Sequence, residues 1–80
     1  MDIGVPREHR VDEFRVGLTP AGVELLTAGG HSCFVEKGAG QGAGFADREY
    51  ERAGGRIVYS PQEAYGRAAL VLKVERPTAE

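Results

Sequence analysis

A helix start, a helix stop and a strand follow one another in Thr19-Pro20-Ala21-Gly22-Val23-Glu24-Leu25-Leu26-Thr27-Ala28-Gly29-Gly30-His31-Ser32-Cys33-Phe34-Val35-Glu36. The hydroxyl of Thr19 can accept a hydrogen bond from a free N–H of the first helical turn. Pro20 falls at the first helical position, where its missing N–H costs nothing. We therefore expect a helix that is capped by Thr19 and follows the helical pattern from Ala21 onward.

The same stretch also predicts where this helix ends and which element comes next. Gly29-Gly30 is a typical helix stop, because glycine adopts the left-handed conformation that closes a helix without strain. His31–Glu36 is then predicted to be a strand, which gives the order helix, short turn, strand. The expected inner face of the helix carries Val23, Leu26 and Thr27, with Leu25 beside them.

The chain before this unit begins with another strand. Asp2–Val5 is predicted to be extended and to end at Pro6, and residues 7–12 form a charged loop. Phe14–Leu18 is predicted to be a second, short extended piece. A strand, a helix and a strand joined by short loops are typical of α/β architecture.

The helix–Gly-Gly–strand order recurs after residue 44. Asp47 is predicted to cap a second helix that turns Tyr50 and Ala53 inward, and Gly54-Gly55 is predicted to end it. The strand Arg56–Tyr59 is expected to follow directly.

A third helix has a complete start signal in Ser60-Pro61-Gln62-Glu63. Serine at the N-cap, proline at the first position and glutamate at the third form a capping box. This helix is expected to be short and to end near Gly66. Ala68–Val74 is the most hydrophobic run and does not alternate, which is typical of a strand buried on both faces of a parallel sheet.

These elements predict one small α/β domain. Because strand–helix–strand connections are right-handed, the helices should cover the faces of a mostly parallel sheet. We expect a flavodoxin/Rossmann-like partial domain, since 80 residues allow at most one small hydrophobic core.

Composition narrows the classes of function. The formal net charge is -2 and the basic residues are dispersed, which argues against a nucleic-acid-binding surface. No apolar run is long enough to cross a membrane, and the N-terminus lacks a signal-peptide pattern. The single cysteine cannot form an internal disulfide, and there is no His/Cys cluster for a metal. The cytoplasm is therefore the expected compartment.

A glycine-rich stretch satisfies a dinucleotide-binding pattern but fails its structural requirements. Gly38-Ala39-Gly40-Gln41-Gly42-Ala43 matches G-x-G-x-x-[G/A] after a strand. The predicted helix cap, Asp47, lies four residues after Ala43, and the next strand ends without an acid for the ribose. We expect instead a tight crossover that brings the backbone close to a neighbouring segment, with no cofactor-binding residue in this chain.

Two cations are candidate ligand-binding residues. Arg15 lies just ahead of the expected start of the first helix, where anions are favoured, although it can equally be an exposed arginine beside Glu13. Lys73 lies at the C-terminal end of the most hydrophobic strand, where ligands gather in open α/β sheets. It either extends past the sheet edge into solvent or presents its ammonium to an anion. Together they would suit a small carboxylate.

Other reactive residue types suggest no catalytic group. His9 lies in a charged loop, and His31 follows a helix stop, where it would cap carbonyl groups or pack at a strand start. Cys33 lies within a strand and is expected to be a buried small hydrophobe. The acidic residues are expected to be caps and solvated side chains.

Several blocks of the sequence resemble the N-terminal domain of alanine dehydrogenase. The same domain occurs in the alpha subunit of the proton-translocating nicotinamide nucleotide transhydrogenase, and a related one in saccharopine-type lysine-degrading enzymes. Residues 13–23 and the Gly-Phe-Ala-Asp block look closer to alanine dehydrogenase. The blocks are Ile3–Glu8, Glu13–Val23, Gly30-His31, Val35-Glu36, Gly38–Gly42, Gly44–Asp47 with Tyr50, Ala53-Gly54, and Leu72–Val74 followed by Pro77.

The resemblance implies that these residues are the N-terminal substrate-binding part of an NAD-dependent alanine dehydrogenase, an oxidoreductase that converts L-alanine to pyruvate and ammonia. It also implies roles for two residues here. In the family, the residues that match Arg15 and Lys73 bind the carboxylate and the keto oxygen of pyruvate. The catalytic histidine and aspartate and the NAD-binding Rossmann domain lie further along the family's chain. We therefore expect residues 1–80 to be a partial substrate domain without a catalytic residue, inactive alone, from an enzyme that is usually a homo-oligomer. An anion-binding or partner-docking module without chemistry of its own stays an alternative, as does part of a transhydrogenase alpha subunit.

Overall fold

A computed structural model describes residues 1–7, 16–67 and 70–71 of the chain. In this described part, four strands form one sheet in the order β3-β2-β1-β4, and every neighbouring pair is parallel. The strands are β1 (Asp2–Val5), β2 (Ser32–Glu36), β3 (Arg56–Val58) and β4 (Leu70–Val71). The predicted α/β class with a parallel sheet is confirmed.

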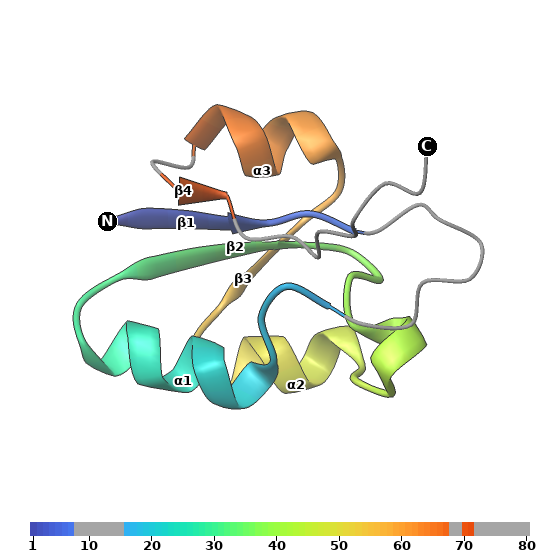
Figure 1. Cartoon of the computed structure of the whole chain (residues 1–80), viewed down its shortest axis with the longest axis horizontal. Coiled ribbons are helices and arrows are strands. Elements are labelled where there is room, and N and C mark those ends of the chain that lie inside the picture. Colours follow the sequence, from blue (N-terminus) through green and yellow to red (C-terminus); the bar gives the residue numbers. More distant parts are fainter. Residues whose placement is uncertain (8–15, 68–69, 72–80) are drawn as a thin grey trace, which may run out of the picture.

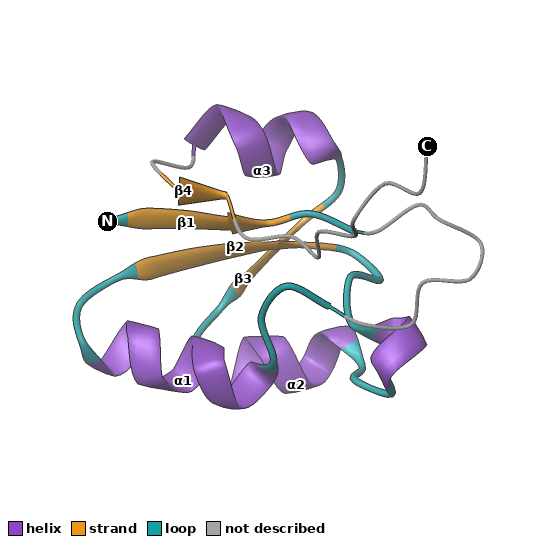
Figure 2. Ribbon diagram, in the orientation of Figure 1, coloured by secondary structure: helices purple, strands orange, loops and turns teal. Residues whose placement is uncertain are grey.

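The helices cover both faces of this sheet (Figure 1). The helices α1 (Pro20–Ala28) and α2 (Asp47–Arg52) lie on one face, and α3 (Pro61–Arg67) lies on the other (Figure 2). A single turn of 3-10 helix, η1 (Gln41–Ala43), interrupts the connection from β2 to α2. Since each connecting helix runs back across the sheet, the N-termini of α1 and α3 lie towards the carboxyl ends of the strands (Figure 1).

The first helix starts and ends as its sequence predicts. Thr19 is the N-cap, and its Oγ1 accepts a hydrogen bond from the Gly22 amide at 3.2 Å. At the other end Gly30 has φ +92°, and the His31 amide donates to the Leu26 carbonyl at 3.0 Å. Because His31 still belongs to this helix stop, β2 begins one residue later than predicted, at Ser32.

The second helix differs from its prediction at the cap. Ala46, and not Asp47, is the N-cap, and its amide donates to Glu49 Oε2 at 2.8 Å. The carboxylate of Asp47 is used elsewhere: Oδ1 accepts from the Gly38 amide at 2.8 Å. The predicted inward face is confirmed, since Tyr50 is fully buried and Ala53 is partly buried.

The third helix is confirmed over Pro61–Arg67, with Ser60 Oγ accepting from the Glu63 amide at 3.2 Å. The strand before it is shorter than predicted, because Tyr59 already lies in a bend and is 73% exposed. The extended piece predicted at Phe14–Leu18 is wrong for residues 17–18, which form a bend, and Val16 belongs to no strand, while residues 14–15 lie outside the described part. Of the predicted strand Ala68–Val74, only Leu70–Val71 is described, as β4.

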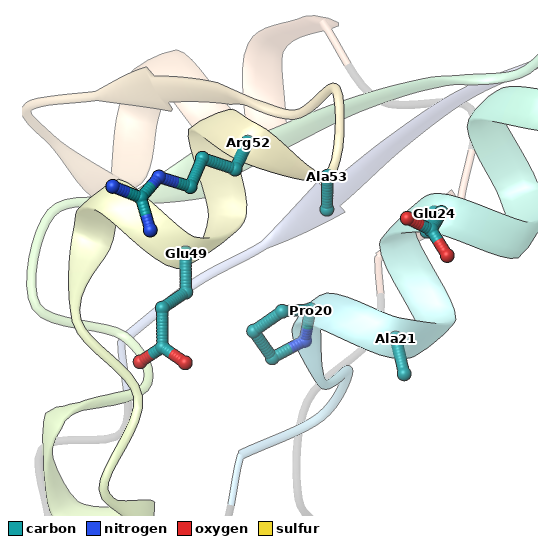
Figure 3. A pocket seen from close by; sticks show the side chains of 6 residues that line it. All are labelled: Pro20, Ala21, Glu24, Glu49, Arg52 and Ala53. Atoms are coloured by element: carbon teal, nitrogen blue, oxygen red, sulfur yellow. The ribbon is translucent and has the colours of Figure 1, made fainter.

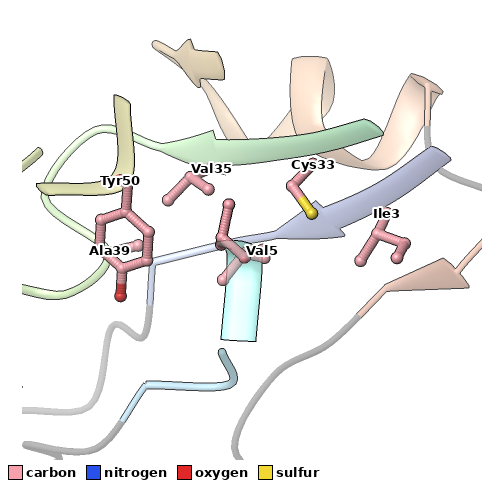
Figure 4. Close-up of a cluster of buried hydrophobic side chains, with 7 residues drawn as sticks. Ile3, Val5, Cys33, Val35, Ala39 and Tyr50 are labelled. Atoms are coloured by element: carbon pink, nitrogen blue, oxygen red, sulfur yellow. The ribbon is translucent and has the colours of Figure 1, made fainter. Parts of the chain in front are cut away.

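The larger core lies between the sheet and the α1/α2 layer (Figure 4). Its buried members come from β1, β2, both helices of that layer and the glycine-rich loop. On α1, Val23 is fully buried, whereas Leu25 points into solvent with 76% of its surface exposed. The buried members are Ile3, Val5, Val23, Cys33, Val35, Ala39 and Tyr50.

Candidate functional site

The carboxyl ends of the two central strands are joined by a buried carboxylate. Glu36 ends β2 and is only 7% exposed, and its Oε1 accepts a hydrogen bond from the Arg7 amide at 2.8 Å. Arg7 follows the end of β1, so this bond links the two strand ends directly. Sequence reasoning treated the acidic residues as caps or solvated groups, and Glu36 contradicts this. The extended run Cys33–Glu36 carries no signal that its last, charged residue is buried.

The glycine-rich loop serves packing within the fold. A Cβ on Gly40 would lie 2.6 Å from the Tyr50 ring and 2.9 Å from Phe45 Cβ, so only glycine fits there. The Phe45 and Tyr50 rings meet edge to face, with centroids 6.5 Å apart. The predicted close approach of this backbone to a neighbouring segment is confirmed.

The same loop does not fit the phosphates of a dinucleotide. The Gly38 amide, which begins the motif, donates to the Asp47 carboxylate, so an anion of the chain itself holds this donor. Amides of Ala39, Gln41 and Ala43 are engaged by backbone carbonyls of residues 36, 38 and 40. A phosphate at this position would lose the amide donors of a Gly-rich site and meet a negative charge.

The segment after Arg15 is held against the core. Val16 and Leu18 are partly buried against the larger cluster, and the Tyr50 hydroxyl donates to the Leu18 carbonyl at 2.9 Å. Burial, followed by the nearby carboxylates of Glu49 and Asp47, raises the pKa of Tyr50 to about 12. The phenol therefore stays protonated and remains a donor at neutral pH.

The two predicted substrate-binding residues, Arg15 and Lys73, lie outside the described residues, as does His9. The described residues nearest to them in sequence are Val16 and Val71. β4 pairs in parallel with β1, with Ile3 opposite Leu70 and Gly4 opposite Val71. It is therefore directed towards the edge at which β1 and β2 end.

The remaining candidates are structural. His31 is partly buried, and its Nδ1 lies 3.3 Å from the N-terminal amino group. Its amide caps the Leu26 carbonyl, as predicted. Cys33 is 1% exposed, and burial raises the pKa of its thiol, which fits the prediction of a buried small hydrophobe.

A hollow of about 280 Å³ opens between α1 and α2 (Figure 3). Pro20, Ala21 and Glu24 come from α1, and Glu49, Arg52 and Ala53 come from the end of α2 and the residue after it. Its charged side chains are exposed, and Glu49 already accepts from the Ala46 amide. The hollow therefore offers no enclosed set of free polar groups for a small ligand.

The order and spacing of these features match a known family. The model of the alanine dehydrogenase/PNT N-terminal domain matches residues 4–80. The chain belongs to this family.

Curated relatives in the family are alanine dehydrogenases. The chain is 46% identical to alanine dehydrogenase of Bacillus subtilis over 80 residues, which is 100% of the chain and 21% of that protein. It is 44% identical to alanine dehydrogenase of Methanococcus maripaludis over 77 residues, or 96% of the chain and 21% of that protein. The chain thus spans about a fifth of the length of these relatives.

Solved structures of the family have the same fold. An L-alanine dehydrogenase superposes with a TM-score of 0.90 at 47% identity, over 99% of this chain and 22% of that one. A transhydrogenase from Sinorhizobium meliloti superposes with a TM-score of 0.84 at 34% identity, over 100% of this chain and 22% of that one. The resemblance inferred from the sequence blocks is confirmed.

Proposed function

We propose that residues 1–80 are the N-terminal, substrate-binding part of an NAD-dependent alanine dehydrogenase, which converts L-alanine to pyruvate and ammonia. The observation that carries this proposal is the combined similarity to L-alanine dehydrogenase, with 47% identity and a TM-score of 0.90. The transhydrogenase is similar at lower values, 34% and 0.84. A docking module without chemistry has no comparable support.

Arg15 and Lys73 are the proposed substrate ligands. The guanidinium of Arg15 suits a carboxylate, because its planar fork can donate two parallel hydrogen bonds. The ammonium of Lys73 is a point charge that would stabilise the negative charge developing on the carbonyl oxygen. Two observations support the pair: the backbone from Val16 to Leu18 is held against the core, and β4 is directed towards the carboxyl edge of the sheet.

NAD would supply the hydride acceptor in the complete enzyme. The described residues do not fit its phosphates, because Asp47 and backbone carbonyls already use the amides of the glycine-rich loop. From the family resemblance, we place the NAD-binding Rossmann domain and the catalytic residues outside residues 1–80. The isolated chain is accordingly expected to show no pyruvate- and ammonia-dependent oxidation of NADH.

The test is kinetic and uses the complete protein that contains this chain. Arg15→Lys should raise the KM for pyruvate, because the bidentate contact is lost. Lys73→Met should lower kcat/KM by about 100- to 1,000-fold, as expected for the loss of a donor to a developing oxyanion. Arg52→Met, which changes an exposed side chain on α2, is the matched control and should leave the kinetics unchanged.

The outcomes separate the alternatives. Failure of the unmodified protein to couple NADH oxidation to pyruvate and ammonia would exclude alanine dehydrogenase and favour the transhydrogenase-like or docking functions. Wild-type kinetics in both site variants would remove Arg15 and Lys73 from the proposed site while leaving the activity in place.

The wider setting of the protein is proposed on the same basis. We place it in the cytoplasm, as a homo-oligomer whose small-molecule ligands are alanine or pyruvate, ammonia and the cofactor. Among residues 1–7, 16–67 and 70–71, no helix is long and apolar enough to cross a membrane. Light scattering of the complete protein measures its assembly state, and a monomer would contradict the oligomer.

A further inference from the structure

The carboxyl edge of the sheet contains the point at which the chain changes the direction of its winding. From β1 the chain passes through α1 to β2 on one face of the sheet, whereas α3 leads to β4 on the other face (Figure 2). Because β1 and β4 are neighbours, the change of direction lies between them. Ligands of open α/β sheets bind outside the carboxyl ends of the strands at such a point. Arg7 lies there, as the second residue after the end of β1.

Two carboxylates lie close to Arg7 at this edge. Glu36 Oε1 accepts a hydrogen bond from the Arg7 amide at 2.8 Å, and Glu36 is only 7% exposed. Asp47 is partly buried, and its Oδ1 accepts from the Gly38 amide at 2.8 Å. A backbone amide satisfies a carboxylate oxygen but leaves its negative charge in place. A poorly solvated carboxylate is costly unless an opposite charge compensates it.

The side chain of Arg7 is placed to supply that opposite charge. A Cβ on Gly38 would lie 3.7 Å from both Cδ and Nε of Arg7, so the arginine side chain packs over this glycine. The amide of Gly38 binds Asp47, and the amide of Arg7 itself binds Glu36. The guanidinium therefore lies close to both carboxylates. Arg7 is also exposed, so its charge acts on ligands that approach the carboxyl edge from solvent.

We propose that Arg7 is a specificity-determining residue for the substrate anion, because its charge offsets those of Glu36 and Asp47 at the edge where the substrate binds. This inference rests on the proposed function, which supplies pyruvate as the substrate. Pyruvate carries one negative charge, so two uncompensated carboxylates at this edge would repel it. L-Alanine carries an ammonium as well as a carboxylate, and its net charge is zero at neutral pH. Arg7 therefore favours binding of the 2-oxo acid over binding of the amino acid.

The size and the salt dependence of this effect follow from simple electrostatics. Two unit charges about 10 Å apart in water interact by an amount that corresponds to about a twofold change in a dissociation constant, and by more where the protein excludes water. The Debye length falls from about 30 Å at 0.01 M salt to about 3 Å at 1 M salt. An effect of Arg7 through its charge should therefore disappear at high salt, whereas an effect through packing should remain.

The test measures the dissociation constant of pyruvate by isothermal titration calorimetry, on the complete protein with NADH bound and ammonia absent. Arg7→Met should raise this constant about 2- to 5-fold at about 0.01 M salt, and should match the unmodified protein at about 1 M salt. Arg7→Lys keeps the charge and should stay within about 1.5-fold of the unmodified protein. In Arg7→Met the KM for L-alanine at neutral pH should change by less than about 1.5-fold, because the zwitterion has no net charge.

Asp47→Asn provides a compensating change. Asparagine keeps an oxygen that can accept from the Gly38 amide, and it removes the negative charge. Combined with Arg7→Met, it should return the dissociation constant of pyruvate at low salt to within about 1.5-fold of the unmodified protein. A loss of binding caused by misfolding would not be rescued by a second substitution that removes a charge.

Arg52→Met is the matched control for charge. Arg52 is an exposed residue in the last turn of α2, just before the chain enters β3 at the amino edge of the sheet. This variant removes the same charge away from the carboxyl edge. It should therefore change the dissociation constant of pyruvate by less than about 1.5-fold at both salt concentrations.

The outcomes separate this inference from the proposed function. Unchanged pyruvate binding in Arg7→Met at low salt would overturn the inference alone. So would a weakening that persists at high salt, an equal loss for L-alanine, an equal loss in Arg52→Met, or a double variant no better than Arg7→Met. An unmodified protein that neither binds pyruvate nor oxidises NADH with pyruvate and ammonia would overturn both.

Discussion

Among the described residues, the two faces of the sheet carry hydrophobic clusters of very different size. On the α1/α2 face, β1 contributes Ile3 and Val5, and Tyr50 fills the space beneath the glycine-rich loop. On the α3 face, β1 presents Gly4, and the buried cluster among the described residues consists of Phe34, Val58 and Ala64. Side chains alternate along a strand, so β1 supplies apolar side chains to only one of the two cores.

Because the two faces differ in burial, we expect them to contribute unequally to the stability of the fold. The α1/α2 face has fully buried residues from four parts of the sequence, tied by the hydrogen bonds of Tyr50 and Thr27 to backbone carbonyls. The described part of the α3 face is thinner, and Tyr65 on the helix and Tyr59 beside it are 46% and 73% exposed. We expect substitutions on the first face to dominate the free energy of unfolding.

The largest effect should come from Tyr50→Ala. Removing this ring leaves a cavity among Ala39, Gly40 and Phe45, and we expect a loss of about 3–5 kcal/mol in the free energy of unfolding. Urea denaturation followed by circular dichroism measures it. Tyr65→Ala on α3 is the control and should cost less than about 1 kcal/mol. Equal losses of unfolding free energy in Tyr50→Ala and Tyr65→Ala would contradict the expected difference between the two faces.

A sharper comparison uses two valines on neighbouring strands. Val35 is 0% exposed on the central strand β2, and Val58 is 7% exposed at the end of β3. Truncation to alanine should cost about 2 kcal/mol at Val35 and about 1 kcal/mol at Val58, because the site at the strand end can relax more. Denaturant midpoints in paired experiments give the ratio. A larger loss at Val58 would mean that the α3 face carries more of the stability than its burial indicates.

The N-cap residues should contribute equally to stability on both faces of the sheet. Thr19 Oγ1 and Ser60 Oγ each accept one amide hydrogen bond at 3.2 Å, at the starts of α1 and α3. Thr19→Ala and Ser60→Ala should each cost about 1 kcal/mol in thermal unfolding, since both caps satisfy one free amide. A cap effect confined to α1 would show that α3 is not independently ordered.

The smallest predicted effect is the contribution of Tyr50 to the pH dependence of stability, which is absent at neutral pH and appears only above about pH 10. Its pKa is raised from 10.0 to about 12 in the fold, chiefly by burial. Between these values the unfolded chain has lost this proton and the folded chain keeps it, so stability falls as pH rises from about 10 to about 12. Tyr50→Phe should flatten this part of the stability profile, measured by denaturant titration at each pH. An unchanged slope would place the titrating group elsewhere.

Local signals in the sequence were sufficient for most of the fold. Thr19, Ser60 and the Gly-Gly pairs act through their own neighbours, so helix starts and stops could be predicted without knowledge of the tertiary structure. Asp47 shows the limit of this reasoning. Aspartate is a common N-cap residue, but the carboxylate of Asp47 accepts a hydrogen bond from the amide of Gly38, nine residues earlier. Ala46 is the N-cap instead.

The long-range bonds could not be predicted in this way. The Tyr50 hydroxyl meets a carbonyl 32 residues earlier, and Glu36 meets an amide 29 residues earlier. Nothing in the spacing of these residues indicates such partners, because they depend on how the strands and helices are assembled. The family's blocks supplied Arg15 and Lys73 by position, whereas the long-range partners of Glu36 and Tyr50 emerged only from the contacts.

The fit of Tyr50 against Gly40 has a consequence for how sequences of this family can diverge. A side chain at position 40 would occupy the space of the tyrosine ring, so the two positions are expected to change together during evolution. A relative with alanine or serine at position 40 should carry a smaller residue at position 50. The residue at position 40 of the glycine-rich motif would then follow the size of the side chain at position 50, and would not depend on which cofactor the protein binds.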